Sequence, residues 1–189
     1  MRNRRSLRWL VAALVAACVI GGSASPADDG EKLRPLRLTK PPEFTNVTRW
    51  INSGPLTLAG LRGKVVIVHF WTHGCYNCVN NYVHYKEWIK RYEGKDVVMV
   101  GVHTPETPGE RNIEAIEAQA KKHGLSFPIA VDNEGANWKA WKNRYWPTVY
   151  VIDRKGRVRQ GWEGELNYKG QKGEETLRKV IDGLLKERA

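Results

Sequence analysis

Cysteine is scarce in this sequence, with three residues among 189. Three are too few for disulfides to replace a hydrophobic core, which excludes the disulfide-stapled miniproteins. Internal repeats and low-complexity tracts are lacking, and no apolar run is long enough for a comfortable span of a bilayer. With 41% apolar and 27% charged residues, the composition argues against a disordered, collagen-like or polytopic membrane protein and predicts one globular domain.

The first 25 residues are typical of an export signal. Four arginines precede an apolar run over residues 9–20, and small residues follow that suit a signal peptidase. We therefore expect a signal peptide over residues 1–25, a linker over 26–43 and a redoxin-type domain over 44–189, in an exported, periplasmic or otherwise extracytoplasmic protein. The alternative is a lipoprotein signal ending at residue 17, with lipidated Cys18 as a membrane anchor.

Basic residues outnumber acidic ones without forming a basic face. Removal of residues 1–25 takes away four arginines and no acid, so the formal charge falls from +11 to +7. The remaining Lys and Arg are interleaved with Asp and Glu, which is typical of a solvated surface. Nucleic acid is therefore not predicted as a partner.

Strand and helix signals alternate along the expected domain. A continuous apolar run over residues 65–70 predicts a strand buried on both faces, and helical periodicity follows from Cys75 until Gly94. The further elements that we expect are a strand over 97–102, a helix over 111–123, a strand over 129–131, a helical segment around Trp138 and Trp141, a hairpin of strands 148–152 and 158–162, and a terminal helix with Leu177, Val180, Ile181, Leu184 and Leu185 on one face. This order predicts an α/β fold with a central mixed β-sheet flanked by helices and an N-terminal extension.

Two of the cysteines form a Cys-x-x-Cys motif between the buried strand and the helix. Cys75 stands at the expected helix N-terminus, where unpaired N–H groups stabilise a thiolate, so it is the predicted nucleophile. Cys78 lies one turn further on the same face, where it can displace a mixed disulfide from Cys75. The motif therefore supplies both attack and resolution.

Three other uses of the cysteine pair stay open beside redox exchange, and they are a zinc site, covalent haem attachment and an inert disulfide. A zinc site would have to recruit His73 or His84, because a second cysteine pair is lacking. Covalent haem would need a histidine where Val79 stands, and an inert disulfide needs no further residue. The placement between strand and helix favours redox chemistry over all three.

Four segments of the chain match segments of a known family and occur in the same order. The segments are Gly-Lys-Val-Val-Ile-Val-His-Phe-Trp (63–71), Gly-Val-His-Thr-Pro-Glu (101–106), Pro-Ile-Ala-Val-Asp-Asn (128–133) and Tyr-Trp-Pro-Thr-Val-Tyr-Val-Ile-Asp (145–153). From about Phe44 onward the chain resembles the thioredoxin-like superfamily, and within it the exported redoxins with the DipZ-type soluble domains and periplasmic thiol-disulfide oxidoreductases. The resemblance implies a thioredoxin-like fold, disulfide exchange with protein thiols and disulfides, and no cofactor besides the Cys75–Cys78 disulfide. It also implies a redox partner, soluble or membrane-bound, that the sequence does not identify.

The resemblance further implies roles around the pair. Cys75 attacks, Cys78 resolves, and Pro147 is the cis-proline that faces them. His69 stands where related domains commonly hold a buried acid, so it is either a base for Cys78 or a core histidine. Gly74 departs from the thioredoxins, which usually carry Trp at this position. The resemblance therefore does not imply a particular reduction potential for the cysteine pair.

Aromatic residues near the motif suggest the kind of substrate. Trp71, Tyr76 and Trp146 are expected to line a shallow apolar groove around Cys75, with the core as the alternative place for Trp71. Backbone pairing at Trp146 would suit an extended polypeptide. The sequence therefore predicts protein substrates rather than a small peroxide.

Two other functions remain as hypotheses. Thr72-His-Gly-Cys75 matches the end of the peroxiredoxin motif, although Val68 stands where that motif has proline, so a thiol peroxidase is the second hypothesis. A copper-binding metallochaperone module is the third, with the two cysteines as soft ligands and His73 or His103 nearby.

Overall fold

The computed structural model describes residues 39–187. The expected signal peptide, Cys18 and the linker up to residue 38 lie outside the described residues. The elements are β1 (Arg49–Ile51), β2 (Val65–Trp71), α1 (Tyr76–Arg91), β3 (Val97–His103), the 3-10 turn η1 (Pro108–Arg111), α2 (Ile113–His123), β4 (Ile129–Val131), α3 (Ala136–Ala140), β5 (Thr148–Ile152), β6 (Val158–Glu163), the 3-10 turn η2 (Tyr168–Gly170) and α4 (Gly173–Leu184).

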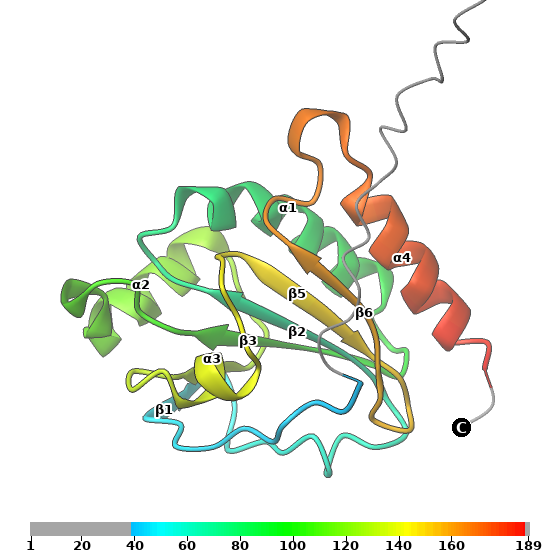
Figure 1. The fold of residues 1–189 in the computed structure, drawn as a ribbon, viewed down its shortest axis with the longest axis horizontal. Helices are drawn as coiled ribbons and strands as arrows, with labels where there is room; N and C mark the ends of the chain where they lie inside the picture. The colour runs from blue at the N-terminus through cyan, green and yellow to red at the C-terminus, as the bar shows by residue number, and fades with distance from the viewer. Residues whose placement is uncertain (1–38, 188–189) are drawn as a thin grey trace, which may run out of the picture. The chain divides into compact units, whose positions relative to one another are not determined.

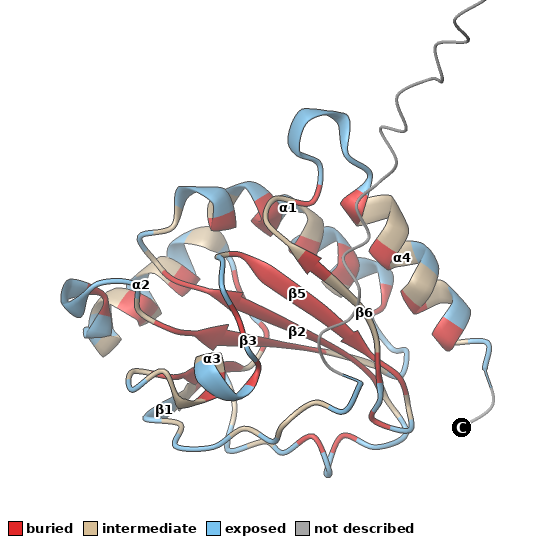
Figure 2. Ribbon diagram, viewed as in Figure 1, coloured by how far each residue is buried: buried red, intermediate tan, exposed pale blue. Residues whose placement is uncertain are grey.

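The strands form one mixed sheet in the order β1-β4-β3-β2-β5-β6 (Figure 1). β2 is parallel to β3 and antiparallel to β5, and β3 is parallel to β4. β1 and β6 are antiparallel edge strands. All of β2 is buried, because elements cover both faces of the sheet (Figure 2). The predicted fold class, a mixed sheet flanked by helices, is confirmed.

Different elements cover the two faces. Apolar side chains of α1, α2 and α4 pack against the odd-numbered residues of β2 on one face. The even-numbered residues face Trp141, which follows α3, and the segment that precedes β2. Because successive side chains of a strand point to opposite faces, this alternation decides on which side each residue of β2 lies.

Every expected helix and strand is present, with bounds shifted by about two residues. The helix expected from residue 111 begins at Ile113, because the side chain of Asn112 caps it by accepting a hydrogen bond from the backbone of Ala115. Gly124 ends this helix in the left-handed conformation, with a φ of 65°. β1 was not predicted, since three residues are too short for a recognisable alternation.

Candidate active site

The Cys-x-x-Cys motif lies where the central strand leads into α1. β2 ends at Trp71, and Cys75 is the N-cap residue of α1. Cys75 and Cys78 form a disulfide, with their Cα atoms 5.3 Å apart. The sequence therefore folds the pair into the junction at which a helix N-terminus meets the end of a buried strand.

The environment of the two sulfurs is unequal. Cys78 is fully buried, whereas Cys75 is partly exposed. The backbone N–H of Cys78 donates a hydrogen bond to the Sγ of Cys75 at 3.1 Å. The first turn of α1 has no acidic side chain, so none within the helix offsets the positive potential of its N-terminus. This potential favours a thiolate on Cys75, the sulfur that a substrate can reach.

A shallow pocket of about 340 Å³ opens beside Cys75, and its lining is Gly74, Cys75, Tyr76, Asn77, Glu106, Arg144, Tyr145 and Trp146. Tyr76 is 77% exposed and Tyr145 is 53% exposed. Two large aromatic side chains that reach the solvent at a reactive sulfur offer a contact surface for a further molecule. The pocket thus joins the start of α1 to the residues before β5.

Trp146 forms one wall of this pocket and is held from two sides. Its ring stacks on that of Trp138, with the ring centroids 3.8 Å apart. Its Nε1 donates a hydrogen bond to the backbone oxygen of Thr104 at 3.1 Å. The next residue, Pro147, is buried, and the peptide bond between Trp146 and Pro147 is cis. A second pocket of about 290 Å³ continues beyond Trp146 and shares Glu106 with the first.

Of the two places expected for Trp71, the structure shows the core and not the groove. Its side chain is fully buried and packs edge-on against Tyr82 and His103, with ring centroids 6.0 Å and 5.0 Å apart. An odd-numbered residue of β2 faces the layer of α1 rather than the pocket. Tyr76 and Trp146 are the members of the expected set that line it.

His69 is fully buried on the same face of β2. Its ring packs against those of Tyr85 and Phe127, with centroids 4.6 Å and 5.0 Å apart. Burial lowers its pKa from 6.5 to about 3, and neither ring nitrogen has a hydrogen-bond partner among the described residues. A pKa lowered this far makes the ring a weak base near neutral pH, and its packing is that of a core histidine, so the structure favours the core alternative.

Sequence reasoning missed two contacts, one from the last residue of β3 and one from η1. His103 is buried, and its Nε2 accepts a hydrogen bond from the backbone N–H of His73 at 3.2 Å and lies 3.3 Å from the hydroxyl of Thr72. Glu110 is nearly buried and lies against Gly74. The matching run over 101–106 marked this segment, but not which side chains touch the residues before Cys75.

The part of the chain from residue 39 to 187 offers no group of three or more His, Cys, Asp or Glu side chains arranged for a metal ion. The same part has no helix with the length and apolar character to cross a membrane.

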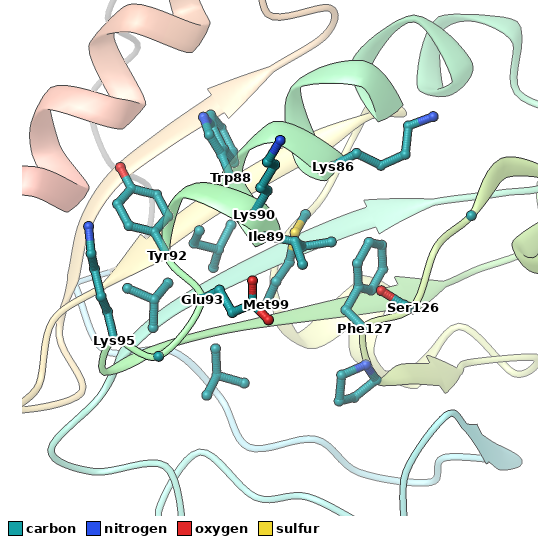
Figure 3. Close-up of a pocket in the computed structure, with 16 residues that line it drawn as sticks. Lys86, Trp88, Ile89, Lys90, Tyr92, Glu93, Lys95, Met99, Ser126 and Phe127 are labelled. Carbon is teal, nitrogen blue, oxygen red and sulfur yellow. The ribbon is translucent and has the colours of Figure 1, made fainter.

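A larger hollow, of about 530 Å³, lies between the end of α1, the start of β3 and the loop after α2. Figure 3 shows Lys86, Lys90 and Lys95 around apolar side chains there. Neither cysteine lines it.

A cysteine pair of unequal exposure at the first helix after the central strand defines a protein of the thioredoxin-like class. Comparison with known sequences agrees with this class. The chain belongs to the AhpC/TSA family, which matches residues 39–161.

Individual relatives include a protein named as a thiol-disulfide oxidoreductase. The chain is 39% identical to DipZ of Mycobacterium tuberculosis over 130 residues, which are 67% of this chain and 19% of DipZ. It is 32% identical to the thiol-disulfide oxidoreductase YkuV of Bacillus subtilis over 126 residues, which are 66% of this chain and 84% of YkuV. The solution structure of an oxidised thioredoxin-like protein superposes with a TM-score of 0.68 at 29% identity, covering 80% of this chain and 98% of the other. This chain therefore spans about a fifth of the length of DipZ and most of YkuV.

Proposed function

We propose that this chain exchanges disulfides with protein substrates through Cys75 and Cys78. The observation that carries the proposal is the disulfide at the N-terminus of α1, with its reachable sulfur beside an aromatic pocket and its second sulfur buried. The names of its relatives support the same activity. The Cys75–Cys78 disulfide is the only redox group that the proposed reaction needs.

The reaction that we propose runs in two steps. The Cys75 thiolate attacks one sulfur of a client disulfide, which forms a mixed disulfide and releases the other client sulfur as a thiolate. Cys78 then loses its proton and attacks the Sγ of Cys75, which forms the Cys75–Cys78 disulfide and releases the second client thiol. Two electrons pass from the cysteine pair to the client, and the reverse sequence oxidises a client. A separate redox partner, soluble or in a membrane, has to restore the starting state.

Extended polypeptide is the substrate class that the pocket favours. Tyr76 and Trp146 present apolar surface in the pocket beside Cys75, and the stack on Trp138 fixes the indole of Trp146. In this proposal the peptide groups around Trp146 and Pro147 pair with the client backbone, which gives affinity without a defined sequence. The base role of His69 for Cys78 stays a prediction, which the low basicity of its buried ring disfavours.

Insulin reduction and refolding of scrambled ribonuclease test the activity in both directions. We expect Cys75→Ser to remove it, and Cys78→Ser to accumulate a mixed disulfide on Cys75, which mass spectrometry detects. Tyr168→Phe, an exposed aromatic outside the pocket, serves as the matched control and should keep full activity. Full activity of Cys75→Ser would overturn the proposal.

The peroxidase hypothesis has less support. The Thr72 side chain is buried, and its hydroxyl lies 3.3 Å from the Nε2 of His103, so it does not reach the pocket beside Cys75. Turnover of hydrogen peroxide much faster than that of any protein disulfide would nevertheless place the peroxidase first. Stoichiometric binding of Cu(I) without thiol exchange would instead favour the metallochaperone.

We also propose that the domain acts outside the cytoplasm. The arginine-rich head and apolar run of the first 25 residues support export. Cleavage after Ala24 would release a protein with two cysteines, whereas lipidation of Cys18 would tether the same domain to a membrane. The intact mass of the mature N-terminus distinguishes these outcomes, and a full-length cytoplasmic product would contradict both.

A further inference from the structure

A nearly buried carboxylate lies against the residue that precedes the nucleophile. Glu110, in η1, is 8% exposed, and its Oε1 occupies the place that a Cβ at residue 74 would take. Any side chain at this position would overlap the carboxylate. Gly74 is therefore the residue that lets Glu110 approach the redox loop, by which we mean residues 72–75.

Two backbone groups hold the Glu110 carboxylate in this place. Its Oε2 accepts hydrogen bonds from the backbone N–H of Glu106 at 2.6 Å and of Thr107 at 3.0 Å. The bond from Thr107 belongs to a capping box at the start of η1. Moving the carboxylate away from Gly74 would break these bonds, so the negative charge is fixed beside the redox loop.

Resting on the proposed function, we propose that Glu110 is a positioning residue that lowers the reduction potential of the Cys75–Cys78 pair and makes the dithiol a reductant. Its charge lies one residue from Cys75 and disfavours the thiolate that the N-terminus of α1 favours. A less stable thiolate means a less stable reduced form, so the equilibrium moves toward the disulfide. The pair then gives its two electrons more readily to a client disulfide, which leaves as two thiols.

Other charged or titratable groups face the redox loop from neighbouring elements. Glu106 and Arg144 line the open pocket, where their opposite charges offset each other and water screens them. His73 lies within the loop, and its Nδ1 is 3.3 Å from the Nε2 of the neutral, buried His103. Among these groups, the Glu110 carboxylate is the charge that is both buried and fixed.

Glu110→Gln tests the role of the charge, because the amide oxygen of Gln can still accept the two backbone hydrogen bonds. We expect the equilibrium with a glutathione buffer to shift about tenfold toward the dithiol, which corresponds to ~30 mV. The pH profile of Cys75 alkylation should move to a lower thiolate pKa by about one unit. Glu134→Gln, an exposed partner of Arg111 at 3.9 Å, is the matched control and should change neither quantity.

Gly74→Ala supplies an independent test, because the added Cβ displaces the carboxylate while the charge remains in the chain. It should shift the potential in the same direction as Glu110→Gln, and the double variant should add little. A wild-type potential in both single variants, or a shift of both toward a stronger reductant, would overturn the inference. Neither readout uses a client protein, so a wild-type chain that fails to exchange protein disulfides would refute the proposed function alone.

Discussion

Two buried neutral histidines should make the folded protein sensitive to mild acid. Burial lowers the pKa of His69 from 6.5 to about 3, and burial together with the nearby His73 lowers the pKa of His103 to about 3. Between these values the unfolded chain binds two protons that the folded chain does not. The free energy of unfolding therefore rises with pH in this window and falls as the solution becomes acidic.

The size of the effect follows from the two pKa values. Each pH unit below 6.5 costs about 1.4 kcal/mol for each histidine that stays neutral in the folded state. At about pH 5 the loss is therefore about 2 kcal/mol for His69 and a similar amount for His103, or about 4 kcal/mol together. This loss is a large share of the ~5 to 15 kcal/mol that usually stabilises a domain.

Urea unfolding of the oxidised protein between about pH 7 and pH 5 measures this dependence. His69→Leu and His103→Gln change the stability at pH 7 for reasons of packing, so the quantity to compare is the slope of stability against pH. Each single variant should lower the slope by a similar amount, and the double variant should lower it most. The slope that remains includes the contribution of His123, whose pKa is also lowered by burial and by Lys122 and Lys86. A wild-type slope near zero, or a double variant with the wild-type slope, would refute the reasoning.

Two further predictions concern buried carboxylates away from the cysteines. Asp132→Ala should lower the free energy of unfolding by about 3 to 5 kcal/mol, because four donors, on Thr104, Asn137 and Trp138, lose their acceptor. Urea titrations measure this loss, and a value below about 1 kcal/mol would contradict the prediction. For Asp153, burial raises the pKa, but hydrogen bonds from the backbone and side chain of Arg157 and from Arg159 outweigh it and lower the pKa. The carboxylate therefore stabilises the fold above its ordinary pKa of 3.8, and Asp153→Asn should be destabilising at neutral pH and nearly neutral in stronger acid, as thermal unfolding across pH would show.

Local signals in the sequence were sufficient for most elements and for the redox pair. The apolar run of β2, the periodicity of α1 and the left-handed Gly124 each depend on a few neighbouring residues. The position of Cys75 at a helix N-terminus follows from the same neighbours, so its greater exposure than that of Cys78 agrees with the roles predicted from spacing.

The surroundings of the pair depended on contacts between distant segments. Trp71 adjoins the motif in sequence, yet it is buried because its place in β2 turns it toward α1. The parallel register of β2 and β3 pairs Trp71 with His103. This pairing places His103 beside the redox loop, although it is about thirty positions away in the sequence. No periodicity along the chain encodes this register.

The position of a cysteine pair between a buried strand and a helix follows from the sequence alone, because strand, cap and helix signals are local. The charges and rings around that pair depend on how distant segments pack together. Glu110 reaches Gly74 because the parallel pairing of β2 and β3 brings the segment after β3 beside the end of β2, where the backbone N–H of Thr104 donates a hydrogen bond to the oxygen of Trp71. Residues close in sequence therefore determine the chemistry of the nucleophile, whereas contacts between distant segments determine its electrostatic environment.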